Sequence, residues 1–139
     1  MKKIFSAMCA IALMVSMTVI ASCSSKPDDA AAGKIIEKAQ TEDLTESDYG
    51  TLLDYIDGAM DDVLPLFEKI QKASEDGDFD KVMSFTEEAQ KLEAKYSNLQ
   101  DALDLIEDVS DEAIGSANVE KGKKILEKMQ KAGIPIDAF

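Results

Sequence analysis

Apolar side chains return every three or four residues through the middle of this chain, and this spacing restricts what the chain can fold into. The first series has successive spacings of 4, 3, 4, 3, 4 and 3 and comprises Tyr49, Leu53, Ile56, Met60, Val63, Phe67 and Ile70. The second has spacings of 3, 4, 3, 4, 3, 4 and 3 and comprises Val82, Phe85, Ala89, Leu92, Tyr96, Leu99, Leu103 and Ile106. A 3/4 alternation keeps side chains on one face of an α-helix. The pattern therefore predicts two long helices with matching apolar faces.

A strong turn signal separates the two series. Ser74-Glu75-Asp76-Gly77-Asp78 is short and rich in turn-forming residues. Two helices joined by so short a connection pack as an antiparallel hairpin. Further apolar residues widen the first series beyond the narrow stripe of a dimeric coiled coil, which favours a bundle.

The start of the first long helix can be placed from local chemistry. Thr45 suits the N-cap, and Asp48 then falls at N3, as in a short-armed capping box. Leu44 and Tyr49 suit the flanking hydrophobic staple. Gly58 and Pro65 lie inside the helix, and Pro65 is expected to bend it.

Two shorter helices are predicted on either side of the hairpin. Residues 28–40 suit a short leader helix that is too short to be stable alone in water. Residues 109–133 supply a third helix of the bundle, with breaking signals at Gly115 and Asn118 and a stop at Gly133. The fold class expected is all-α: a small up-down-up bundle of about three helices over residues 45–139, preceded by the leader helix.

The N-terminal residues have the layout of a secretory signal peptide. Met1-Lys2-Lys3 is cationic, and the uncharged, largely apolar run that follows ends in Ile20-Ala21-Ser22-Cys23. These last four residues resemble the lipobox of bacterial lipoproteins. The resemblance implies cleavage after Ser22 and a diacylglycerol thioether on Cys23, usually with a further acyl chain that makes the attachment durable. The alternative is an uncleaved transmembrane helix over residues 4–25, which is near the length that spans a bilayer.

The residues that follow Cys23 are predicted to form a flexible tether. Ser24 to Asp29 contain serine, proline and charge but few apolar groups. A lysine and acids close to the lipidated cysteine also resemble the surface-export signal of Bacteroidota lipoproteins. The expected organisation is a signal peptide (1–22), a lipidated tether with the leader helix (23–44) and a bundle domain (45–139). The expected location is the outer membrane, either at the cell surface or on the periplasmic face.

Charge restricts the partners. The 139-residue chain carries a net charge of −13, and removal of Lys2 and Lys3 with the signal peptide leaves −15. A surface this acidic repels nucleic acid. The membrane is then contacted through the lipid, and the expected partner is an envelope protein, a polymer or a cationic ligand.

Basic residues gather near the C-terminus. Residues 118–132 have a net charge of +3, whereas residues 42–112 have a net charge of −17. One interpretation is a basic helix packed on the acidic hairpin. The other is a free partner-binding face made by Lys121, Lys124, Lys128 and Lys131.

Residues 76–87 resemble an EF-hand loop. The oxygen ligands would include Asp76, Asp78, Asp80 and Glu87, although Lys81 replaces the glycine that the sixth position requires. This resemblance gives the alternative function, a lipoprotein that binds calcium or another divalent cation. The competing interpretation is a turn at Gly77 and a helix cap at Asp78.

The residue types required by several catalytic sites are missing. The sequence has no histidine, and Cys23 is the only cysteine left after cleavage. Hydrolytic triads and Glu-x-x-His metal sites are therefore excluded. We predict a non-catalytic, cofactor-free envelope lipoprotein that acts as an acidic helical interaction module.

Overall fold

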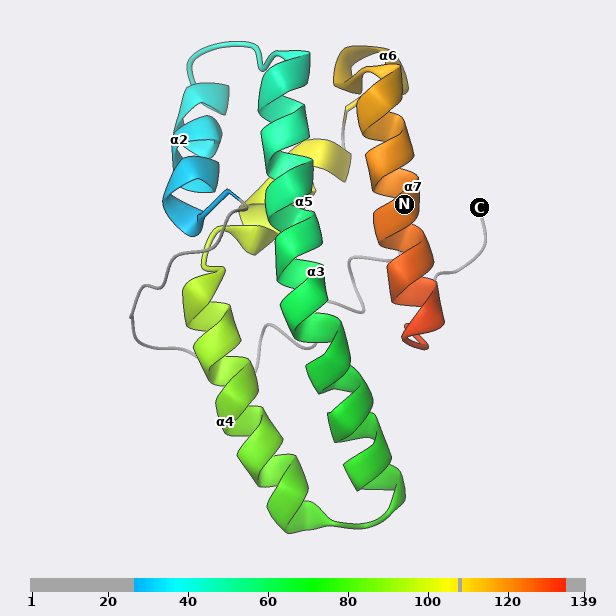
Figure 1. Cartoon of the computed structure of the whole chain (residues 1–139). Helices are drawn as coiled ribbons and strands as arrows, with labels where there is room; N and C mark the ends of the chain where they lie inside the picture. The colour runs from blue at the N-terminus through cyan, green and yellow to red at the C-terminus, as the bar shows by residue number, and fades with distance from the viewer. Residues whose placement is uncertain (1–26, 108, 135–139) are drawn as a thin grey trace.

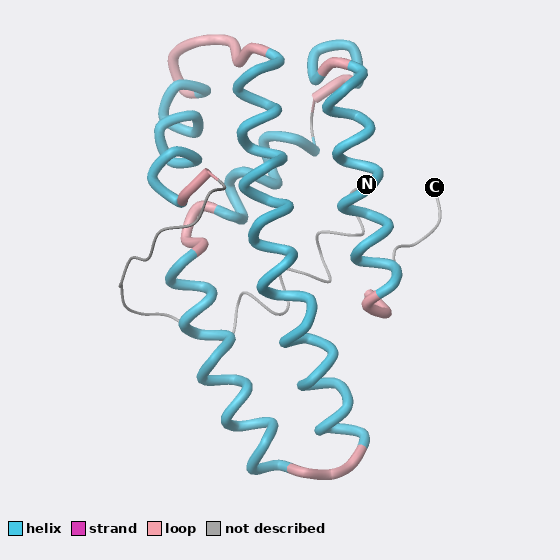
Figure 2. Tube along the Cα trace, viewed as in Figure 1, coloured by secondary structure: helices cyan, strands magenta, loops and turns pink. Residues whose placement is uncertain are grey.

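The computed structural model describes residues 27–107 and 109–134. The predicted signal peptide, the lipobox and Cys23 lie outside these residues. The prediction of an all-α fold is confirmed, since the described residues form helices joined by turns, without strands (Figures 1 and 2). Six helices are present in this part of the chain, instead of about three: α2 (Asp29–Ala39), α3 (Glu46–Glu75), α4 (Phe79–Lys95), α5 (Leu99–Glu107), α6 (Asp111–Ile114) and α7 (Ser116–Lys131).

Helix α3 is the central element, and it begins where the sequence predicts. The Thr45 hydroxyl accepts from the Asp48 backbone N–H at 3.3 Å, and the Asp48 carboxylate accepts from the Thr45 N–H at 2.8 Å. This capping box is the predicted one. The helix continues for 30 residues through Pro65, and Figure 1 shows its lower half inclined to its upper half. The missing N–H of proline accounts for a bend at this point.

The cap also predicts a pH effect. The Asp48 carboxylate accepts from the Lys38 ammonium at 2.7 Å and from Thr45, and these bonds lower the pKa of Asp48 to about 2. Because this pKa lies below the unfolded value, the stabilisation is present above about pH 4 and is lost as the pH falls through about 2. We expect Asp48→Ala to cost at most about 1 kcal/mol at pH 7, because the pair is partly exposed.

Urea unfolding of both proteins between pH 2 and pH 7 tests this expectation. The difference between wild type and Asp48→Ala is expected to be constant above about pH 4 and to disappear near pH 2. A difference that is unchanged at pH 2 would show that the carboxylate charge contributes nothing.

The second long helix is broken, and the prediction of one helix over the whole second series is wrong. Helix α4 ends at Lys95 and α5 begins at Leu99. The cause is Asp29, whose carboxylate accepts from the Asn98 backbone N–H at 2.8 Å and from the Ser97 hydroxyl at 2.5 Å. In a continuous helix that N–H would bond to the carbonyl four residues earlier. Here the Asp29 carboxylate accepts from the Asn98 N–H in place of that carbonyl, and the chain turns between α4 and α5.

The hydrophobic core lies in the half of the molecule that contains α2, α5 and α7. The leader helix α2 is docked there, because Ala32 and Ile35 belong to the same buried cluster as Leu52 and Ile56 of α3. Helix α2 therefore contributes two residues to the hydrophobic core. Helix α7 packs along the other side of α3.

The C-terminal region breaks at one of the predicted points. Gly115 has a φ of 89° between α6 and α7, a conformation that favours glycine. An added Cβ would also lie 2.6 Å from a carboxylate oxygen of the exposed Glu46 side chain, which would have to move aside. Buried Asn118 secures the junction by donating to the carbonyls of Glu46 and Ile114 at 2.7 and 2.8 Å.

Leu64 still belongs to this core, but the rest of α3 beyond it and all of α4 extend away from the core. We call residues 61–95 the distal hairpin; it forms the lower part of Figure 1. Helix α4 has 17 residues and contains no buried residue. The distal hairpin is thus a pair of helices that pack on each other with little cover from other elements.

Candidate functional site

An apolar cavity of about 180 Å³ lies where the distal hairpin joins the core. Side chains of α3, α4 and α5 form its walls, and Ile134 follows α7 at its edge. The lining residues are Met60, Val63, Leu64, Leu66, Phe67, Ala89, Leu92, Glu93, Tyr96, Ser97, Leu99, Gln100, Leu103 and Ile134. Such a lining suits an apolar group with few polar contacts.

One wall of the cavity is fixed by a small polar network. The Tyr96 hydroxyl donates to the Asp62 carboxylate at 2.6 Å, and the Lys95 ammonium donates to the same carboxylate at 2.7 Å. Burial opposes ionisation of Asp62, but these two hydrogen bonds hold its pKa below the ordinary value. Burial, together with the bond to Asp62, raises the pKa of Tyr96. The tyrosine is therefore a neutral, positioned wall group at pH 7.

The start of α2 lies beside the cavity. Asp29 accepts from Ser97, a lining residue, and from the Tyr55 hydroxyl at 2.5 Å. Tyr55 is fully buried, its ring meets that of Tyr96 edge to face, and burial raises its pKa. The Asp29 cluster (Asp29, Tyr55, Ser97 and Asn98) thus ties the beginning of the domain to the rim of the cavity.

Two of the four predicted partner-binding lysines form internal ion pairs instead. Lys128 donates to Asp57 and Asp61 of α3 at 2.5 and 2.8 Å, and Lys121 lies 2.9 Å from Asp54. The hydrogen bond from the Lys128 ammonium to Asp57 is the main cause of the raised pKa of Lys128. The basic helix therefore packs on the acidic one, as the first interpretation predicted. Lys124 and Lys131 are exposed.

In this structure residues 76–87 form a turn and the first part of α4 instead of an EF-hand-like loop. Asp76 ends α3, and Asp78 caps α4 by accepting from the Lys81 N–H at 3.2 Å. Asp80 and Glu87 both lie on α4, about 10 Å apart along its axis at 1.5 Å per residue. In the part of the chain that the structure describes, no group of three or more potential metal ligands gathers at one point. The turn-and-cap interpretation accounts for these residues.

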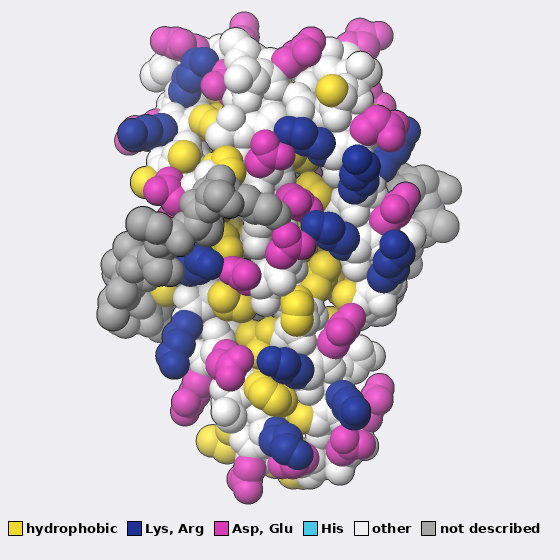
Figure 3. Space-filling model, in the orientation of Figure 1, with side chains coloured by type: hydrophobic (Ala, Val, Ile, Leu, Met, Phe, Trp, Pro, Cys, Tyr) yellow, Lys and Arg dark blue, Asp and Glu magenta, His cyan; other side chains and the backbone are white. Residues whose placement is uncertain are grey.

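Two exposed apolar residues were not recognised in the sequence as functional candidates. Phe79 is 78 % exposed and Met83 is 69 % exposed, both on α4. They lie four residues apart on one helix face, which the sequence shows. Whether another helix covers that face depends on tertiary packing, which the spacing of residues does not show. Figure 3 shows charged side chains of both signs over this face of the molecule, with hydrophobic ones exposed between them in both its upper and its lower half.

No helix among the described residues combines the length and apolar character needed to cross a membrane. Comparison of the chain with protein-family models, with curated proteins and with solved structures found no match.

Proposed function

We propose that this chain is a non-catalytic envelope lipoprotein, anchored through lipid on Cys23, whose helical domain binds another molecule at the cavity and distal hairpin. The observation that carries the proposal is the apolar cavity at the base of a helical pair that other elements barely cover. Concave apolar sites with a few polar groups are where proteins usually bind ligands.

The chemistry of the cavity supports binding over catalysis. Glu93 is the one carboxylate among the lining residues, and Tyr96 is already bonded to Asp62. Catalytic sites usually bring two or more positioned polar groups together at one point. A lining that is apolar apart from its rim suits recognition of an apolar surface.

The tether brings the binding region close to the membrane. If Cys23 carries the lipid, the five residues 24–28 separate it from the start of α2 at Asp29, and the chain between the two spans at most about 22 Å. Asp29 bonds to Ser97 at the rim of the cavity, so the rim lies near the end of the tether. An outer-membrane lipoprotein would hold its partner at the membrane surface, on the outer or the periplasmic face.

Metabolic labelling with an alkyne-bearing fatty acid tests the anchor, and the two cysteines provide a matched pair of variants. We expect label on the wild-type chain and on Cys9→Ser, because Cys9 lies in the segment that is removed. Cys23→Ser is expected to lose the label and to be released from the membrane fraction. Label that persists on Cys23→Ser, or an intact Met1 on the membrane-bound protein, would contradict the proposal.

A further inference from the structure

Helix α4 has an uncharged face wider than one helix can cover. At 100° per residue, one half of its circumference carries a single charged residue, Glu93. The other residues of this half are Val82, Phe85, Ala89, Leu92 and Tyr96, next to Phe79, Met83, Thr86 and Gln90. The first five are half-buried, and three of them line the cavity, whereas Phe79 and Met83 are largely exposed. Since a packing stripe on one partner takes roughly 100°, the remainder of this face has no covering helix within the described residues.

Helix α3 contributes a matching strip. Phe67 and Ile70 are half-buried, Gln71 and Ser74 are exposed, and all four fall within about 100° of its circumference. In an antiparallel pair this strip and the uncovered face of α4 lie on the same side. We call the surface formed by these two faces, which is uncharged apart from Glu93, the hairpin groove. It continues from the cavity, which Phe67 and Ala89 also line, toward the tip.

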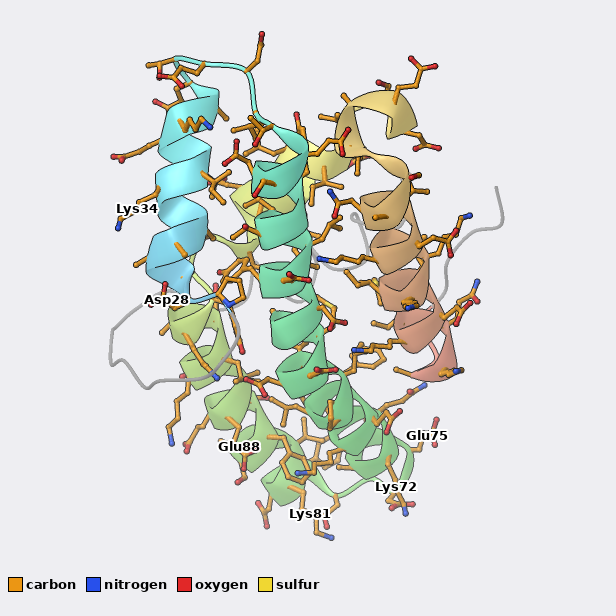
Figure 4. All side chains as sticks on the ribbon, turned by 45° about the horizontal axis from the view of Figure 1, so that its top comes forward. Asp28, Lys34, Lys72, Glu75, Lys81 and Glu88 are labelled. Atoms are coloured by element: carbon orange, nitrogen blue, oxygen red, sulfur yellow. The ribbon has the colours of Figure 1, made fainter. Side chains whose placement is uncertain are left out.

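Acidic side chains border the groove on both sides. Glu68 and Glu75 follow the strip on α3, and Asp80 and Glu87 follow the uncharged face of α4. All four are exposed, and none pairs with a lysine of the described residues. Lys72 lies further round α3 than Glu75, and Figure 4 shows both extending outward from the end of that helix.

The charge of these borders distinguishes between the possible occupants. A second copy facing the groove would bring its own four carboxylates against them, and like charges repel. Anionic lipid headgroups are disfavoured for the same reason. A cationic partner is attracted, because the distal hairpin carries ten acidic residues against five lysines. Two of these lysines, Lys81 and Lys95, are paired with Asp78 and Asp62.

We propose that the hairpin groove binds a cationic amphipathic helix, whose apolar face packs on the groove while flanking lysines or arginines meet the acidic borders. Such a helix acts as a third member of the hairpin, in the mode by which amphipathic helices fill apolar grooves. From Leu92 to Phe79 the groove is about 20 Å long, at 1.5 Å per residue, which suits a partner of about 14 residues. This inference deepens the proposed function and rests on it.

Calorimetric titration of the full chain in nanodiscs of zwitterionic lipid tests this inference. The probes are two 14-residue model helices with leucine at 3/4 spacing, one with lysine and the other with glutamate at the remaining positions; empty nanodiscs provide the background. We expect the lysine helix to bind and to weaken with salt, and the glutamate helix not to bind. Equal binding of both helices, or of neither, would overturn the inference.

Variants locate the site. Phe79→Ser with Met83→Ser, and separately Asp80→Asn with Glu87→Gln, are each expected to weaken binding at least about tenfold. The control pair Glu112→Gln with Glu120→Gln, on α6 and α7, is expected to leave binding unchanged. All of these side chains are exposed, so an unchanged circular dichroism spectrum should accompany each variant. Equal weakening in the control pair would mean general charge attraction and would refute the groove.

Two further measurements distinguish two other possible occupants of the groove. A chain that ends at Ile134 is expected to bind the helix as the full chain does; binding at least about tenfold tighter would assign the groove to residues 135–139 instead. A detergent-solubilised chain that dimerises, and loses the dimer in Met83→Ser, would assign it to a second copy. If the peptides fail but Cys23 labelling succeeds, this inference falls and the lipoprotein proposal stands.

Discussion

Replacing Leu52 with alanine is expected to lower the free energy of unfolding by about 2 to 5 kcal/mol. Leu52 is 0 % exposed and belongs to the cluster that joins α2, α3, α5 and α7. Removing three carbons there leaves a cavity that close-packed neighbours fill only in part. Urea denaturation followed by circular dichroism measures the change.

The matched control for Leu52 is an apolar residue outside the core. Phe79→Ala removes a larger side chain, yet it is expected to change the free energy of unfolding by no more than about 0.5 kcal/mol, because the Phe79 side chain is largely exposed and buries little apolar surface. Equal losses from Leu52→Ala and Phe79→Ala would mean that the distal hairpin is as well packed as the core, which contradicts the structure.

The second large effect is expected at Asp29. Its carboxylate and carbonyl oxygens accept from Tyr55, Ser97 and Asn98, between 2.5 and 3.0 Å. Asp29→Ala deprives the fully buried Tyr55 of the partner for its hydroxyl. With each unsatisfied buried donor costing about 1 to 3 kcal/mol, we expect a loss of about 2 to 4 kcal/mol.

A double-mutant cycle separates this network from general destabilisation. Tyr55→Phe removes the orphaned hydroxyl, so Asp29→Ala is expected to cost less in that background than in wild type. Asp101→Ala, an exposed acid of α5, is the control and is expected to cost no more than about 0.5 kcal/mol. Additive effects of Asp29→Ala and Tyr55→Phe would show that the two side chains are not coupled.

The helical class and the start of α3 could be predicted from the sequence because their causes are local. The 3/4 spacing from Tyr49 onward determines the buried face of α3, and Thr45 and Asp48 form a cap within four residues of each other. The Gly115 break was one of several signals of the same kind in residues 109–133. Such features need no knowledge of distant segments.

The break between α4 and α5 could not be predicted in this way. The apolar spacing continues through Tyr96 and Leu99, so the local pattern favours one helix. The element that ends α4 is Asp29, which lies 69 residues earlier in the chain than Asn98. Periodicity contains no information about such a contact, and a short leader helix gave no reason to expect it.

The candidate site was hidden for a related reason. The spacing places Phe67 on the apolar face of α3, and Ala89 and Leu92 on the apolar face of α4. It does not show whether a third helix covers these faces. Residues 109–133 were expected to supply a third helix that covers the hairpin, whereas α7 packs on the upper part of α3 (Figure 1). Charge asymmetry gave the packing of this helix on the acidic one as one of two interpretations, and Lys121 and Lys128 do pair with acids of α3.

Amide hydrogen exchange of the full chain, measured alone and with the lysine helix, tests most directly whether the distal hairpin is an incomplete bundle that a partner completes. Free α4 is expected to exchange faster than residues 49–60, because it has no buried residue. On binding, residues 66–75 and 79–92 should gain protection while α7 is unchanged. Protection of free α4 equal to that of residues 49–60, or gains confined to α2 and α7, would contradict this account.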